Sequence, residues 1–309
     1  MSEHKSLDWR GKQLTYLPDS VVELVALEEL ELDDNQLASL PEGIGQLANL
    51  NKLSLYSNRL ASLPESLWRL VNLRTLNLSE NHLSYLPAGI GNLIELRMLD
   101  LGHNEITTLP ESIGNLRNLT FLYLSNNRLA SLPRSFENLD SLIYLNITDN
   151  RLDSLLESIG ELSRLIELRL YNNRLSSLPE SLGHLNQLKE LHLMNNKLEL
   201  LPVTIGNLSR LKKLALQGNL LASLPESLGS LTSLTDLDLR DNRLTSLPKS
   251  LGELMALRYL DLRANKLVGL PASIEKLANL EKLDLRWNRL ASLPAWLGRL
   301  EGRGCTVFV

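Results

Sequence analysis

Three Leu-Asp-Leu-Arg segments near the C-terminal end of the chain come closest to a catalytic arrangement. Their aspartates are residues 238, 261 and 284, and an arginine follows each two positions later. If these segments stack as neighbouring strands, the Asp238 and Asp261 carboxylates lie about 5 Å apart, as in a retaining glycosidase. The arginines keep both carboxylates ionised, which argues against that chemistry. We therefore expect a structural ladder or a charged docking patch that supports Trp287, with Tyr259 nearby.

A second group of polar residues has the side chains of a metal site. His82, His103 and Glu105 fall on the same edge of adjacent repeats, and imidazole and carboxylate are both zinc ligands. Exposed variable positions produce such neighbours by chance, so we expect no metal. The segment Gly89-Ile90-Gly91 lacks the strand-turn-helix context of a phosphate loop. With no nucleophile paired to an activating histidine and no cofactor motif, the sequence predicts neither an enzyme nor a cofactor.

One repeating unit supplies the elements that position these residues. Twelve asparagines lie 23 residues apart without a slip, at positions 35, 58, 81, 104, 127, 150, 173, 196, 219, 242, 265 and 288. Around them runs Leu-x-x-Leu-x-Leu-x-x-Asn-x-Leu-x-x-Leu-Pro-x-x-Leu-x-x-Leu, as in residues 50–70. All twelve prolines share one phase of the repeat, and Leu156 occupies the one such position without a proline. The chain is therefore one continuous stack of a single small unit.

Each repeat is expected to form one strand and one short turn. In Leu53-x-Leu55 the period of two points both leucines to one face, and thirteen parallel strands followed by a closing strand bury them in a continuous core. The proline suits the first turn of a short helix or 3-10 turn on the outside. We interpret all twelve asparagines as structural, each pairing with the backbone of its own turn and of the next repeat.

The repeat resembles the leucine-rich repeat family, whose signature is L-x-x-L-x-L-x-x-N-x-L at a period of about 20 to 29 residues. The resemblance runs from about Leu7 to Phe308. The Leu-Pro-x-x-Ile/Leu-Gly-x-Leu half is similar to the intracellular 23-residue class, which includes Ras-binding scaffolds, plant Ras-group-related proteins and bacterial cytoplasmic or injected proteins. It implies an α/β horseshoe solenoid with a parallel β-sheet on the concave face and short helices or 3-10 turns on the convex face.

The ends and the composition indicate the organisation and the compartment. We expect a single domain over residues 1–309, with a degenerate first repeat at about 6–26, full repeats at about 27–302 and a closing strand at about 303–309. The single cysteine, Cys305, leaves no disulfide-bonded caps. The sequence has no recognisable secretory signal and no run of 18 apolar residues, so we expect a cytoplasmic protein.

The variable positions of the strands carry the candidate binding residues. Aromatic side chains, histidines and methionines gather in the central repeats, and exposed aromatics and methionines favour protein binding. The alternative is that the tyrosines only pack on one another across neighbouring strands. The predicted protein-binding residues are Tyr56, Met98, His103, Phe121, Tyr123, Tyr144, Tyr171, His192, Met194, Arg240, Tyr259, Arg263, Arg286 and Trp287.

The resemblance implies protein recognition through the concave face, often in signalling. We expect a monomeric, non-enzymatic scaffold or adaptor that binds a protein partner. The alternatives are a bacterial effector-type protein that binds a host protein and, as a lesser case, a structural role in a cell-surface layer. Nucleic acid is a poor candidate, because the net charge is −4 and there is no extended basic stripe. Membrane insertion is not expected either.

Overall fold

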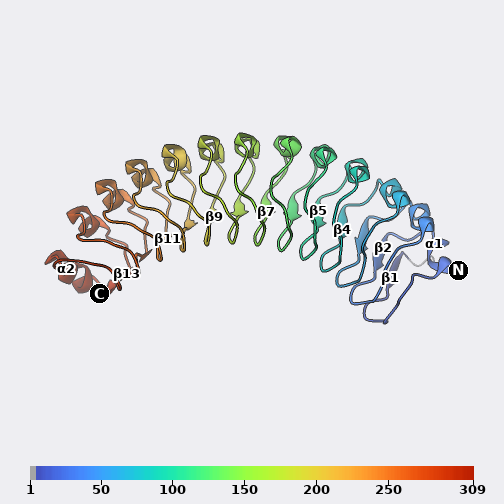
Figure 1. Ribbon diagram of the computed structural model, residues 1–309, viewed down its shortest axis with the longest axis horizontal. Coiled ribbons are helices and arrows are strands. Elements are labelled where there is room, and N and C mark those ends of the chain that lie inside the picture. The colour runs from blue at the N-terminus through green and yellow to red at the C-terminus, as the bar shows by residue number, and fades with distance from the viewer. Residues whose placement is uncertain (1–4) are drawn as a thin grey trace. The chain divides into compact units, whose positions relative to one another are not determined.

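The computed structural model, drawn in Figure 1, describes residues 5–309. Contacts group the chain into two compact units, Met1–Arg151 and Leu152–Val309. Within each unit the strands are parallel and follow one another in sequence order. The short turns lie on the opposite side of each unit from the strands. The fold class predicted from the repeat is confirmed. The assignment of residues 1–309 to a single domain stays a prediction.

The described part of the first unit, residues 5–151, contains seven strands. They are β1 (Ser6–Asp8), β2 (Glu29–Glu31), β3 (Lys52–Ser54), β4 (Thr75–Asn77), β5 (Met98–Asp100), β6 (Phe121–Tyr123) and β7 (Tyr144–Asn146). Between them lie a short α-helix and five 3-10 turns, namely α1 (Asp19–Val22), η1 (Glu42–Gln46), η2 (Glu65–Arg69), η3 (Ala88–Asn92), η4 (Glu111–Asn115) and η5 (Arg134–Asn138).

The second unit also contains seven strands. They are β8 (Glu167–Arg169), β9 (Glu190–His192), β10 (Lys213–Ala215), β11 (Asp236–Asp238), β12 (Tyr259–Asp261), β13 (Lys282–Asp284) and β14 (Thr306–Phe308). Its turns and helix are η6 (Glu157–Glu161), η7 (Glu180–His184), η8 (Val203–Asn207), η9 (Glu226–Ser230), η10 (Lys249–Glu253), η11 (Ala272–Lys276) and α2 (Trp296–Gly302). The predicted closing strand is β14, which pairs with β13.

The register follows directly from the 23-residue period. Leu30 pairs with Leu53, and Leu53 pairs with Leu76, so the middle residue of each strand meets its equivalent on the next strand. These leucines have no exposed surface. A strand of three residues cannot bury such side chains alone, whereas neighbours stacked about 4.8 Å apart enclose them together.

The asparagines form a buried ladder of hydrogen bonds. Asn58 accepts the backbone N–H of Leu37 at 3.0 Å and donates to the carbonyl oxygen of Leu32 at 2.9 Å. It also donates to the carbonyl of Leu55 in its own turn at 3.2 Å. The structural role predicted for the asparagines is confirmed. The predicted direction was wrong, because the second partner belongs to the preceding repeat and not to the next one.

The prolines stand just before the 3-10 turns and not inside them. Pro41 has φ −69° and ψ 149°, and its carbonyl accepts the N–H of Ile44 at 3.0 Å to close the first turn. The ring fixes φ near this value before folding, and the missing N–H costs nothing at a position without a helical partner. Leu156 has the same geometry, with φ −73° and ψ 150°.

Replacing Leu156 with proline is expected to stabilise the protein. The backbone already has the angles that proline requires, so the substitution mainly lowers the entropy of the unfolded chain and adds about 0.4–1 kcal/mol. Urea unfolding of Leu156→Pro and wild type measures this gain. A Leu156→Ala variant controls for loss of the half-buried side chain, and a proline variant less stable than the alanine variant would contradict the expectation.

Candidate functional site

The surface that carries the variable residues is the exposed side of the sheet. The strand face, as we call it, consists of the first and third residues of each strand and the residue two positions beyond its end. On β6 these are Phe121, Tyr123 and Ser125, whereas Leu122 and Leu124 between them have no exposed surface. The inward leucines are therefore alike from repeat to repeat, and chemical identity lies on the strand face.

In the first unit, aromatic residues come together on the adjacent strands β6 and β7, and a methionine lies beside them on β5. Met98 on β5 pairs with Phe121 on β6, which pairs with Tyr144 on β7. The ring centroids of Tyr123 and Tyr144 are 5.0 Å apart, with a tilt of 38°. These two tyrosines thus pack on each other, as the alternative interpretation requires, and both are half-buried. Phe121 is 40% exposed and is the aromatic anchor most available to a partner.

Two other predicted residues of this unit lie apart from that group. Tyr56 follows β3, two strands from β5, and its hydroxyl bonds to Glu80, which raises the tyrosine pKa. His103 is exposed, with its Nε2 3.2 Å from Asn126 Nδ2. Its φ of 52° is left-handed, as is that of most residues directly before a ladder asparagine. His103 therefore marks the loop edge of the strand face.

In the second unit, a hydrogen-bonded group surrounds one predicted residue, His192. Its Nε2 lies 3.0 Å from a Glu190 oxygen and 4.0 Å from a Glu167 oxygen, and Glu167 also pairs with Arg169. Burial lowers the pKa of His192, and the positive charges of Lys213 and Arg169 lower it further. Glu190 acts in the opposite direction, but the net pKa is lowered. The neutral imidazole is thus favoured, and only 6% of the residue is exposed.

Glu167, Glu190 and His192 are also the one group of three possible metal ligands among residues 5–309, since their ligand atoms lie within 4.8 Å of one another. This trio differs from His82, His103 and Glu105, the possible ligands found in the sequence. The signal was present, because the two glutamates hold the same strand position one repeat apart. Their hydrogen bonds to one another and to Arg169 account for the cluster without a metal.

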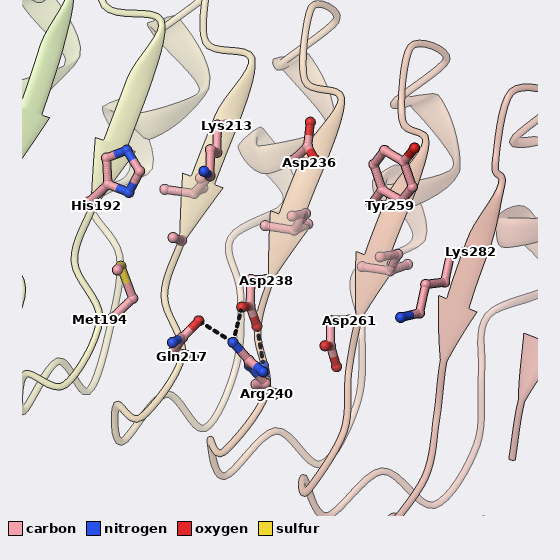
Figure 2. Close-up of a pocket in the computed structure, with 14 residues that line it drawn as sticks. His192, Met194, Lys213, Gln217, Asp236, Asp238, Arg240, Tyr259, Asp261 and Lys282 are labelled. Carbon is pink, nitrogen blue, oxygen red and sulfur yellow. Dashed lines mark hydrogen bonds and ion pairs between the residues drawn. The ribbon is translucent and has the colours of Figure 1, made fainter.

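An open groove of about 430 Å³ crosses the strands of the second unit from β9 to β13 (Figure 2). One wall carries Lys213, Asp236, Tyr259 and Lys282, which are the first residues of β10 to β13. The other wall and the ends are formed by His192, Met194, Gln217, Asp238, Arg240 and Asp261, and leucines lie beneath. Figure 2 shows the two walls as separate rows of side chains on consecutive strands.

The floor of the groove includes Ala215, a residue with a small side chain. Ala215 ends β10, between His192 on β9 and Asp238 on β11. Because alanine has no atoms beyond Cβ, the floor of the groove is apolar at this point, and the side chains of His192 and Asp238 on either side are larger. Met194 and Tyr259 add apolar surface, and Tyr259 is 39% exposed. The groove thus offers an apolar floor between polar walls, as binding sites commonly do.

The three aspartates and three arginines form the predicted charged ladder. Arg240 lies 3.1 Å from Asp238, and Arg263 bonds to both oxygens of Asp261 at 2.9 and 3.1 Å. Arg286 bonds to Asp284 at 2.9 Å, and Arg263 lies 3.4 Å from the same carboxylate. Each of β11 to β13 therefore carries an Asp/Arg ion pair, and Arg263 links the pairs of β12 and β13.

The ladder shifts the aspartate pKa values in two directions. Burial raises the pKa of Asp238, against the opposing bonds and charge of Arg240. Burial also acts to raise the pKa of Asp284, but the hydrogen bonds and charge of Arg286 outweigh it and the net pKa is lowered. Each carboxylate forms an ion pair with an arginine, which is the arrangement expected of a structural ladder.

Trp287 lies over the end of this ladder, as predicted. It is 70% exposed, and the guanidinium of Arg286 is 5.4 Å from its ring centroid, a cation–π arrangement. The expectation that Tyr259 lies near it was wrong. Tyr259 starts β12 and pairs with Lys282, five residues before Trp287, which puts it about 16 Å away along the strand direction. The Tyr259 side chain lines the groove instead.

The remaining predicted residues of the second unit lie beside or within the groove. Tyr171 follows β8 and is half-buried. Of the predicted residues, His192, Met194, Arg240 and Tyr259 line the groove, and Arg263 pairs with one of its aspartates. Sequence analysis missed Lys213 and Lys282 on the wall and Ala215 on the floor. Ala215 could have been found, because it is the smallest residue at the third strand position throughout the repeats.

Sequence comparison decides the family. A model of the leucine-rich repeat region matches residues 60–172 and 149–247, and a second leucine-rich repeat model matches 13–83 and 232–290. The chain belongs to the leucine-rich repeat family. Comparison with curated proteins gives no significant match.

Solved structures of leucine-rich repeat proteins share the fold. A leucine-rich repeat protein of Leptospira interrogans is 38% identical, with a TM-score of 0.89 over 96% of this chain and 76% of that one. An internalin of Listeria monocytogenes has a TM-score of 0.83 at 23% identity, over 98% and 86% of the two chains, and supports the fold alone. The plant peptide hormone receptor RGFR1, in complex with RGF2, is 29% identical with a TM-score of 0.69, over 92% and 55%.

No helix within residues 5–309 combines the length and the apolar character needed to cross a membrane. The two α-helices, α1 and α2, have four and seven residues.

Proposed function

We propose that this leucine-rich repeat protein is a non-enzymatic binding module that recognises a protein partner on its strand face. The groove over β9 to β13 carries the proposal, because it combines an apolar floor with polar and aromatic walls on a surface of rigid strands. In the first unit, Phe121 adds an exposed anchor of the type that dominates protein interfaces. Leucine-rich repeat folds commonly act as protein-interaction scaffolds, and the proposal assigns that role here.

The bonding of the charged groups supports binding over catalysis. Asp238 and Asp261 are each paired with an arginine, and His192 is bonded to Glu190. A general acid or base must be able to reach and exchange a proton with a substrate, whereas these groups are engaged with their own neighbours. The same pairs give the strand face a fixed pattern of charge, which favours specific association.

Two related complexes support a protein or peptide partner. The plant receptor RGFR1 is seen with RGF2. A chain in the structure of the Toll–Spätzle complex of Drosophila is 26% identical to this chain, with a TM-score of 0.82 over 96% of this chain. This chain spans 55% and 46% of those two chains, so their partners are not assigned to it.

A scaffold role in intracellular signalling is part of the same proposal and rests on the resemblance of the repeats to the intracellular class. The second candidate is a bacterial protein that binds a host protein. The 38% identity to a Leptospira interrogans protein favours it, since that relative is bacterial and the chain covers 76% of it. The two candidates share the strand face and differ in the source of the partner.

Photo-crosslinking from defined positions tests the proposal. Benzoylphenylalanine is placed at Phe121 or Tyr259 on the strand face, and, as matched controls, at Ile94 or Met255, which are exposed outside it. The proposal predicts protein adducts from the first pair and none of the same mass from the second. Adducts only from the control positions would reject the strand face as the binding surface. Parallel exposure to bacterial and animal-cell lysates separates the two candidates.

A further inference from the structure

The charges that line the groove are not equally available to a ligand. Asp238 and Asp261 are neutralised by Arg240 and Arg263. Arg240 is further fixed by a 2.9 Å bond to Gln217 Oε1, as Figure 2 shows. The wall with the Asp/Arg pairs therefore has balanced charges. The charges of the opposite wall then determine whether the groove favours an acidic or a basic ligand.

That opposite wall is cationic. Within residues 5–309, the side-chain amino group of Lys213 makes no hydrogen bond or ion pair, and its positive charge adds to burial in lowering the pKa of His192. The amino group of Lys282 lies 5.3 Å from the Phe308 ring centroid and is in no ion pair within the same residues. Asp236 accepts a hydrogen bond from the Thr235 hydroxyl at 2.6 Å. Two lysines thus face one aspartate, and residues 236–303 as a whole hold 12 basic and 9 acidic side chains.

The distance between these two lysines sets the distance between the ligand charges that can pair with both. Lys213 and Lys282 start β10 and β13, which are three strands apart and hence about 14 Å apart. An extended peptide advances about 3.3 Å per residue, so residues four positions apart span this distance. Asp236, on β11 between them, disfavours a carboxylate at the intervening positions. Beside Lys213, the low floor at Ala215 has room for an apolar side chain.

We propose that this groove binds an extended acidic segment of the protein partner, lying across the strands with two carboxylates about four residues apart. One carboxylate pairs with Lys213 and the other with Lys282, and an apolar side chain of the segment covers Ala215. This inference rests on the proposed protein-binding function and specifies the partner chemistry at one part of the strand face.

Selection from a phage-displayed library of random seven-residue peptides tests the inference. The purified wild-type protein is compared with the double variant Lys213→Glu/Lys282→Glu. The matched control is Lys197→Glu/Lys266→Glu, which makes the same change of charge at exposed lysines outside the groove. Selected peptides are then synthesised with a fluorescent label, and their Kd values are measured by fluorescence anisotropy.

Wild type and the control are expected to select peptides with two acidic residues about four positions apart, and the groove variant is expected to bind them at least tenfold more weakly. An Ala215→Phe variant, which fills the floor, is expected to weaken binding while keeping a wild-type circular dichroism spectrum. Peptides without acidic enrichment, equal binding by the groove variant, or no selected peptide would each overturn the inference. In any of those cases, crosslinks from the strand face to a folded partner would still support the proposed function.

Discussion

Replacing Asn127 with alanine lowers the free energy of unfolding by about 3 kcal/mol, because a buried backbone donor loses its only partner. Asn127 accepts the N–H of Ile106 at 2.9 Å and donates to the carbonyl of Leu101 at 2.9 Å. The Leu101 carbonyl keeps a second donor in Asn104. The Ile106 N–H has no such substitute within residues 5–309, and Ile106 is fully buried.

Asn288 provides a matched control for this prediction. It makes the same bonds, to the N–H of Leu267 at 3.1 Å and the carbonyl of Leu262 at 2.9 Å. However, it is half-buried near the end of the stack, so water can replace the lost amide. Urea unfolding followed by circular dichroism is expected to show a clearly smaller loss for Asn288→Ala than for Asn127→Ala. Equal losses would show that burial does not set the cost of breaking the ladder.

Replacing Gly252 with alanine is expected to destabilise the protein by about 2–3 kcal/mol through overpacking. An added Cβ would lie 2.2 Å from the Ser273 carbonyl oxygen and 2.6 Å from its carbonyl carbon. Those atoms belong to the backbone of the next turn and cannot rotate away, so two neighbouring turns must separate. The glycine is therefore required for the close approach of η10 and η11, with no functional role implied.

Gly298 is the matched control, since it holds the same position of the repeat. A Cβ there meets nothing within 4 Å, and the residue lies inside the helix α2. Alanine is favoured over glycine in a helix by up to about 1 kcal/mol, so Gly298→Ala is expected to be neutral or stabilising. Thermal unfolding monitored by circular dichroism compares the two variants. A Gly252→Ala protein as stable as wild type would mean that the turns can shift apart at little cost.

The fold was predictable because the sequence repeats its structural residues at a fixed period. Leu53 and Asn58 recur every 23 residues, as does Pro64 except at Leu156, and each has a physical role that a single repeat already indicates. The direction of the asparagine bonds was not predictable, since an amide can reach the backbone on either side. Two features of the strand face needed only the strand register: the Asp/Arg ladder, which was predicted, and the packing of Tyr123 on Tyr144, which was the alternative to binding.

The groove could not be predicted from the types of residue alone. It depends on the small side chain of Ala215, which the sequence does show, and on which charges are already paired, which the sequence does not show. Arg240 satisfies Asp238, whereas Lys213 is left without an ion pair among the described residues. Lys213 and Lys282 were not singled out from the sequence, because pairing is a property of side-chain geometry. The expectation that Tyr259 lies near Trp287 was wrong, because Tyr259 starts β12 whereas Trp287 lies three residues beyond the end of β13.

The most direct test of the account is the affinity for the crosslinked partner once it is identified and purified. Kd is measured by isothermal titration calorimetry for wild type, for Phe121→Ala and Tyr259→Ala on the strand face, and for Ile94→Ala and Met255→Ala outside it. The account predicts at least tenfold weaker binding for one or both of the strand-face variants and unchanged binding for the other two. Full affinity in both strand-face variants, with binding lost in Ile94→Ala or Met255→Ala, would contradict it.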